Sequence, residues 1–125
     1  MKIYNQDCLK AMKEMSNNQF DLAIVDPPYG SNALDGSKIS KKFNINRSNN
    51  WDCYRPDKLY FKELFRVSKN QIIWGGNYFI NDLKDTKCCI VLDKSNIPDK
   101  FITMSPIELA WTSFNKPSKI FRTST

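Results

Sequence analysis

The sequence contains no histidine, and this absence excludes several kinds of chemistry. Ser-His-Asp and Cys-His catalysis both need an imidazole as the base. The four cysteines include no Cys-x-x-Cys pair, so a zinc site of ordinary spacing is excluded as well. We therefore expect no metal site. Any chemistry must come from carboxylates, backbone groups, aromatic rings or a cofactor.

Long apolar segments are also missing. No run approaches the roughly 20 residues that a membrane-spanning helix needs, and the N-terminus begins without an apolar signal segment. A chain of 125 residues, 41% of them hydrophobic, suits a single domain that covers residues 1–125. The adjacent cysteines Cys88 and Cys89 lie in an apolar run and are interpreted as small buried residues of a reducing compartment. We expect a cytoplasmic protein.

Positive charge is in excess, with 19 lysines and arginines against 13 acidic residues. Much of it falls in residues 30–56, a stretch rich in Ser and Asn that lacks periodicity and is predicted to form one long loop. This loop also contains Phe43, Trp51 and Tyr54. Cations interleaved with aromatic rings are typical of a nucleic-acid-binding surface. The residues predicted to bind its phosphates are Lys38, Lys41, Lys42, Arg47 and Arg55.

The order of apolar patterns predicts an α/β fold. Helices are expected after Asp7, which can cap the first of them, from Asp57 onward, and as a short helix after Gly75-Gly76. The last two predicted strands leave no room for a crossover helix, so we expect them to be antiparallel. The other strands alternate with helices, which predicts a mostly parallel sheet. The predicted strands are 2–4, 22–25 (buried on both faces), 71–74, 88–92 and 107–114.

The tetrapeptide Asp26-Pro27-Pro28-Tyr29 directly follows the predicted strand 22–25. Ligands of an open parallel sheet bind beyond the carboxyl ends of its strands. Proline lacks the amide that a strand ladder requires, so the carbonyls of Asp26 and Pro27 are left without a ladder partner. The Asp26 carboxylate and a fixed carbonyl can then both accept hydrogen bonds from an NH2 group, while Tyr29 offers a flat face to a ring. The motif predicts a site for an exocyclic amine on a ring.

Asp26-Pro27-Pro28-Tyr29-Gly30 resembles the catalytic DPPY motif of amino-group DNA methyltransferases, which flip the target base out of the duplex. The resemblance implies a Rossmann-like methyltransferase sheet, S-adenosylmethionine as the cofactor and double-stranded DNA as the substrate. It implies that Asp26 and Pro27 bind the amino group, Tyr29 stacks on the base and Pro28 shapes the loop. Enzymes that modify N4 of cytosine more often carry Ser at the first position, so Asp26 favours N6 of adenine.

A second segment, Gln6-Asp7-Cys8-Leu9, is similar to the family's Gly-Asp-x-Leu motif, whose acidic residue contacts the cofactor. The resemblance thus implies a cofactor site that includes Asp7, Cys8 and Asp26. On the residues alone, Asp7 is equally well explained as a helix cap. Residues 73–79 resemble a segment of phage and prophage adenine methylases, although glycines in a tight turn and aromatics in a core would give the same pattern.

The family's glycine-rich turn, commonly Phe-x-Gly-x-Gly, is absent from these residues. Their order fits the first half of a circularly permuted member, so we expect the catalytic half of an enzyme, with weak cofactor binding by itself. The family strands that would lie beside 22–25 are then missing. Either strand 2–4 closes up against 22–25, or the exposed edge pairs with another copy or a second chain. An N4-cytosine methyltransferase, an RNA methyltransferase and a non-catalytic nucleic-acid-binding remnant remain as alternatives.

Overall fold

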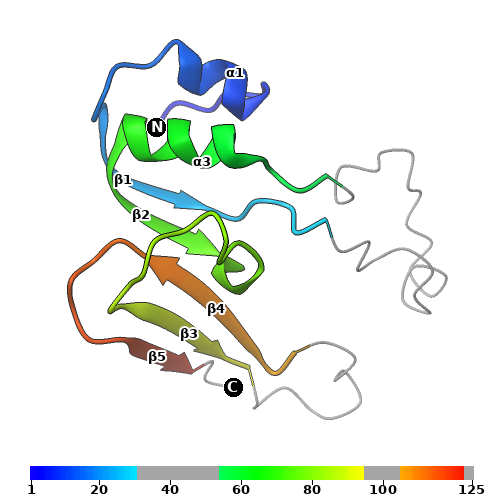
Figure 1. Ribbon diagram of the computed structural model, residues 1–125, viewed down its shortest axis with the longest axis vertical. Coiled ribbons are helices and arrows are strands. Elements are labelled where there is room, and N and C mark those ends of the chain that lie inside the picture. The colour runs from blue at the N-terminus through cyan, green and yellow to red at the C-terminus, as the bar shows by residue number, and fades with distance from the viewer. Residues whose placement is uncertain (31–53, 95–104, 123–125) are drawn as a thin grey trace, which may run out of the picture.

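The computed structural model describes residues 1–30, 54–94 and 105–122. These residues form a five-stranded sheet in the order β1-β2-β4-β3-β5, and the helices α1 and α3 lie together on one side of it (Figure 1). A 3-10 turn, η2, follows the second strand. The elements are α1 (Cys8–Lys13), β1 (Phe20–Val25), α3 (Lys58–Val67), β2 (Ser68–Trp74), η2 (Gly76–Tyr78), β3 (Cys89–Asp93), β4 (Ile107–Thr112) and β5 (Lys119–Arg122).

The sheet is mixed. β1 pairs in parallel with β2, and β3 with β5, whereas β4 is antiparallel to both of its neighbours, β2 and β3. The predicted antiparallel pair near the C-terminal end is therefore confirmed. β1, β2, β3 and β5 all run in one direction and only β4 runs opposite to them, so the prediction of a mostly parallel sheet with an antiparallel strand near the C-terminal end is confirmed. β5 was not predicted from the sequence, since it is four residues long and exposed throughout.

Both helices begin at an aspartate that caps them. The Asp7 side chain accepts a hydrogen bond from the Lys10 amide at 2.8 Å, and Asp57 accepts one from the Tyr60 amide at 3.0 Å. These bonds satisfy amides that have no partner within the helix. The helices predicted after Asp7 and from Asp57 are confirmed. Between them and the sheet lies a core formed by Met12, Tyr60, Phe61, Leu64, Val67, Ile73 and Phe79.

β1 lies at the edge of the sheet and is covered on one face only. Ala23 and Val25 pack against the core, but Leu22 is 41% exposed and Ile24 63% exposed. The prediction that this strand is buried on both faces is therefore wrong, because α1 and α3 lie on the same side of the sheet (Figure 1). The strand predicted at 2–4 does not form either. Its three residues are exposed and do not pair with the edge strand β1.

Arg66 joins the end of α1 to α3. Its guanidinium donates to the carbonyl oxygens of Met12 at 2.6 Å and Met15 at 2.7 Å, while Glu63 holds it in an ion pair at 2.6 Å. Met15 lies beyond the last residue of α1, and no backbone amide of the described residues donates to its carbonyl, whereas the Met12 carbonyl also accepts the Met15 amide at 3.1 Å. The Arg66 guanidinium therefore supplies the donor that the Met15 carbonyl lacks. Arg66 therefore fixes how α1 sits on the core.

Arg66→Leu is expected to lower the free energy of unfolding by about 1–2 kcal/mol, because it leaves the Met15 carbonyl without a donor and removes one of the donors to the Met12 carbonyl. Urea denaturation measures this loss. Lys62→Leu is the matched control, since Lys62 is exposed on the same helix and should change stability by no more than about 0.5 kcal/mol. Equal effects of the two substitutions would show that Arg66 does not hold α1 in place.

Candidate functional site

The Asp26-Pro27-Pro28-Tyr29 turn follows the last residue of β1, at the carboxyl end of a parallel pair. Val25 is in register with Ile73 of β2, so the turn after β1 lies beside the Gly75-Gly76 turn after β2. Asp26 is exposed, Pro27 is buried and Tyr29 is half-buried. The two turns together form the candidate site.

Tyr29 is held by contacts at both ends of its side chain. Its hydroxyl donates a 2.6 Å hydrogen bond to Oδ1 of Asp26. Its ring stacks on Tyr78, with the centroids 4.6 Å apart and the planes 19° from parallel. Burial, followed by the hydrogen bond to Asp26, raises the pKa of the Tyr29 hydroxyl well above its usual range. The hydroxyl therefore keeps its proton and remains a donor at neutral pH.

Gly75 allows this arrangement. Its φ of +65° is unfavourable for other residues, and a Cβ at this position would lie 2.0 Å from Cε1 of Tyr29. The Tyr29 ring thus occupies the space that any side chain at position 75 would need. The predicted tight turn at Gly75-Gly76 is confirmed, and it continues into the short helix η2.

Two acceptors of the turn remain open. Neither Oδ2 of Asp26 nor the carbonyl oxygen of Pro27 has a hydrogen-bond partner in the described part of the chain. The first belongs to an exposed carboxylate and the second to the adjacent residue, which is buried. An amino group with two hydrogens matches this pair of acceptors.

Arg55 supports the end of the turn. Its guanidinium forms an ion pair with Asp82 at 2.8 Å and lies over the Phe79 ring at 5.2 Å. Its Cβ would be 3.0 Å from a Cβ added at Gly30, whose φ is +66°. Arg55 was predicted from the sequence to bind a phosphate, and that role stays a prediction. The partner that the structure gives Arg55 is a carboxylate 27 residues away, which local sequence patterns cannot indicate.

Of the other predicted site residues, Asp7 and Cys8 are described by the structure, and they are not brought together with Asp26. Lys38, Lys41, Lys42 and Arg47 lie outside the described residues. Asp7 and Cys8 lie at the start of α1, and the Asp7 carboxylate accepts the capping bond from Lys10. No hydrogen bond or ion pair between described residues joins Asp7 or Cys8 to Asp26. With no glycine-rich turn in the sequence, the described residues do not fit a complete S-adenosylmethionine site.

Tyr78 is a site residue that the sequence did not reveal. The aromatic residues of 73–79 were interpreted either as part of the methylase resemblance or as core residues. Phe79 is fully buried, but Tyr78 is 49% exposed and stacks on Tyr29. Its position in the sequence could have identified it, because Tyr78 follows the Gly75-Gly76 turn closely. This turn after β2 and the Asp26 turn after β1 lie at the same end of the sheet, where ligands of parallel strands bind. The site thus presents two stacked tyrosine rings beside a carboxylate.

No protein-family model matches this chain, and no curated protein matches it. Among the described residues, no helix has the length and apolar character required to cross a membrane. The same residues contain no group of three or more Cys, Asp or Glu side chains placed to hold a metal ion.

Gly75→Ala is expected to lower the free energy of unfolding by about 3 kcal/mol or more, since the strain of a positive φ adds to the clash with Tyr29. In a Tyr29→Ala background the clash is gone, and the same substitution should cost only about 1 kcal/mol. Chemical denaturation of the four proteins of this double-mutant cycle gives the difference. Equal costs in the two backgrounds would mean that Tyr29 does not rest on Gly75.

Proposed function

We propose that this chain is the base-binding part of an S-adenosylmethionine-dependent DNA methyltransferase that acts on the exocyclic amino group of adenine, at N6. The observation that carries the proposal is the pair of open acceptors on Asp26 and Pro27, beside stacked tyrosines at the carboxyl end of β1. The DPPY resemblance names the same residues.

In this proposal the target amino group donates one hydrogen to Oδ2 of Asp26 and the other to the Pro27 carbonyl. These two bonds draw the hydrogens to one side and leave the nitrogen lone pair directed away from the turn. The Tyr29 hydroxyl, bound to Oδ1, fixes the orientation of the carboxylate. A fixed negative charge also favours the positive charge that develops on the nitrogen as a methyl group is transferred.

The base itself needs a flat surface, and we assign it to the Tyr29–Tyr78 pair. Tyr29 alone offers little free ring surface to a base, since one face of its ring is stacked on Tyr78 and the ring also packs on Gly75. Tyr78 is half-exposed and extends the aromatic surface outward. Stacking on an aromatic side chain contributes about 1–3 kcal/mol per base, which offsets part of the cost of flipping.

Double-stranded DNA is the proposed substrate, and the positive charge of the chain supports it. The net charge is +6, and cations supply most of the sequence-independent affinity for DNA. Within the described part, Arg55 is a basic residue near the turn, and its side chain is 41% exposed even while paired with Asp82.

A second protein chain is the other proposed partner, and the edge of β1 supports it. Exposed edge strands are usually protected by lysine, proline or a bulge. β1 contains neither lysine nor proline, and its single charge, on Asp21, is paired with Lys69 at 2.7 Å. The exposed Leu22 and Ile24 add apolar surface next to this edge. A further copy of this chain is the simplest partner.

Asp26→Ala is expected to lower the rate of methyl transfer by about 10²–10³-fold, because a preorganised acceptor of the amino group is lost. The assay follows a labelled methyl group from S-adenosylmethionine into duplex DNA, with any partner chain that activity requires. Asp21→Ala is the matched control, since Asp21 is an exposed aspartate on the strand that leads to the motif. If both variants transferred methyl groups at the wild-type rate, Asp26 would have no catalytic role.

Residues 1–125 alone are expected to bind S-adenosylmethionine weakly and to self-associate through β1. Calorimetry and analytical sedimentation test the two parts. Ile24→Lys should reduce association, because it places a charge beside the edge. Ile120→Lys, at the opposite edge of the sheet, should not. A chain that stays monomeric and binds the cofactor with micromolar affinity or better would contradict this prediction.

A further inference from the structure

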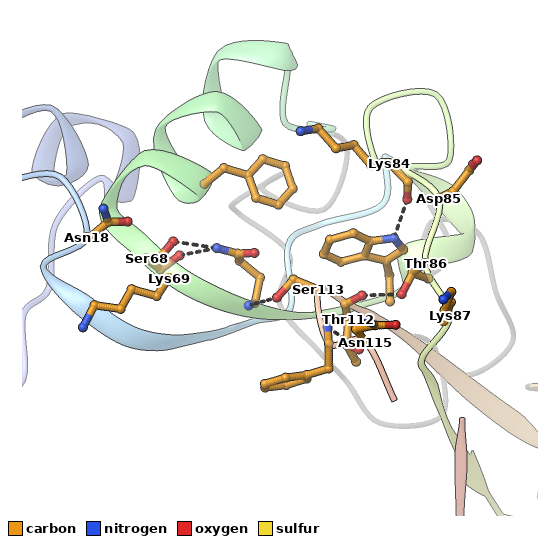
Figure 2. A pocket seen from close by; sticks show the side chains of 14 residues that line it. Asn18, Ser68, Lys69, Lys84, Asp85, Thr86, Lys87, Thr112, Ser113 and Asn115 are labelled. Carbon is orange, nitrogen blue, oxygen red and sulfur yellow. Dashed lines mark hydrogen bonds between the residues drawn. The ribbon is translucent and has the colours of Figure 1, made fainter. Parts of the chain in front are cut away.

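A cavity of about 640 Å³ lies at the end of the sheet opposite the Asp26 turn. It opens where β2 begins, at Ser68, and where β4 ends, at Thr112 (Figure 2). Phe20 at the amino end of β1 is in register with Ser68, whereas Asp26 follows the carboxyl end of the same strand. The cavity is therefore separate from the candidate site and is not explained by the proposed function. Its volume lies within the usual range of small-molecule sites.

We propose that this cavity binds a nucleoside monophosphate, either free or as one unit of a single strand. Three features of the described residues carry the proposal: a buried acceptor on Gln71 to which none of them donates, a corner formed by two aromatic rings, and two lysines on one wall that form no ion pair with any of them. Each matches one part of such a ligand.

The first feature is the Gln71 side-chain amide, in a residue that is only 3% exposed. Its Nε2 donates to the carbonyl oxygen of Ser68 at 2.7 Å and to Oγ of Ser68 at 3.0 Å, the bonds drawn from Ser68 in Figure 2. The hydroxyl of Ser68 donates its own proton to the Leu64 carbonyl at 2.6 Å. Both Ser68 atoms must therefore accept from Gln71, and this fixes the amide with its nitrogen toward Ser68.

It follows that Oε1 of Gln71 points away from Ser68. In the part of the chain that the structure describes, this oxygen has no hydrogen-bond donor, although Gln71 lines the cavity. Buried polar atoms in folded proteins almost always have a partner. A ligand N–H in the cavity would supply the missing donor.

The second feature is the corner made by Phe65 and Trp111. Their ring centroids are 5.8 Å apart, and the ring planes meet at 72°. Trp111 is fixed in place because its Nε1 donates to the Lys84 carbonyl at 2.8 Å. Two fixed rings at this angle leave a flat face on which a planar heterocycle can stack, as bases stack on aromatic side chains in single-strand-binding proteins.

The third feature is the charge of the wall formed by residues 84–87. Lys84 and Lys87 both line the cavity (Figure 2), and neither forms an ion pair with a described residue. Asp85 is the one carboxylate among the described lining residues. Lys69 also lines the cavity, but its ammonium is paired with Asp21 at 2.7 Å. The wall therefore has an excess of free positive charge, which favours an anion.

A nucleoside monophosphate combines the three complementary groups: N–H donors on the base edge, a planar ring and a phosphate. Inorganic phosphate alone would leave the aromatic corner and Gln71 unused. An uncharged planar ligand would leave the lysines unused. A single-stranded nucleic acid offers the same three groups, because each of its nucleotide units carries one base and one phosphate.

Calorimetric titration of the 125-residue chain with adenosine 5′-monophosphate tests the proposal. Adenosine, which lacks the phosphate, should bind about fivefold more weakly. Purine riboside 5′-monophosphate, which lacks the 6-amino group, should bind about tenfold more weakly, because Oε1 of Gln71 would lose its donor. Inorganic phosphate that binds as tightly as the nucleotide, or a nucleotide that does not bind, would overturn the proposal.

Variants assign the binding to the cavity. The double substitution Lys84→Ala/Lys87→Ala should weaken nucleotide binding about tenfold. The charge-matched control Lys58→Ala/Lys62→Ala, on exposed positions of α3, should leave it unchanged. If instead Asp26→Ala abolished binding and the cavity variants did not, the nucleotide would occupy the amine site, and this proposal would fail while the proposed function stood.

A short oligo-deoxyadenosine distinguishes the two sources of the ligand. Tighter binding of the oligonucleotide than of the mononucleotide, lost in Lys84→Ala/Lys87→Ala, would identify a single strand as the ligand. Tighter binding of the mononucleotide, lost in the same variant, would identify a free nucleotide. Both results support the cavity as a nucleotide site, and an oligonucleotide affinity that the double substitution leaves intact contradicts it.

Discussion

The Tyr29 ring rests on Gly75 where no side chain would fit, since a Cβ at Gly75 would lie 2.0 Å from Cε1 of Tyr29. This contact joins two turns that follow neighbouring parallel strands. From this position the Tyr29 hydroxyl reaches Asp26 at 2.6 Å and the ring stacks on Tyr78 at 4.6 Å. The orientation of the Asp26 carboxylate therefore depends on a glycine 49 positions later in the chain. Because the phenol remains protonated, the carboxylate keeps one oxygen bound and one open.

The two helices pack on only one face of the sheet, and this leaves the other face of β1 exposed. α1 and α3 bury one face of β1 and β2, and Arg66 ties these helices together through the carbonyls of α1. The other side of β1 stays open, with Ile24 63% exposed. The carboxyl end of the parallel pair then presents the Asp26 turn, and the amino end of β2 presents the cavity that Gln71 lines. Two separate sites can exist at the two ends of one sheet, because the strands between the Asp26 turn and the cavity hold them at a fixed distance from each other.

Features with a local cause were predictable from the sequence. Asp57 caps its helix because the capping bond spans three residues, and the prolines end β1 because they cannot join a ladder. Features set by distant neighbours were not predictable. The apolar run 22–25 could not show that only one of its faces is covered, and Tyr78 could not be distinguished from a core residue. The open acceptor of Gln71 follows only from a hydrogen-bond network that fixes the direction of the amide.

The central claim is that Asp26 accepts a hydrogen bond from an exocyclic amine, and the carboxyl carbon of Asp26 reports this directly. The ¹³C resonance of this carbon is assigned by its absence from the spectrum of Asp26→Asn. It is then followed as the chain is titrated with a DNA duplex that carries adenine opposite an abasic position. A second duplex carries purine, which lacks the 6-amino group, at the same place. We predict that the Asp26 resonance shifts with the adenine duplex and stays in place with the purine duplex. Equal shifts with both duplexes, or none with either, would contradict the account.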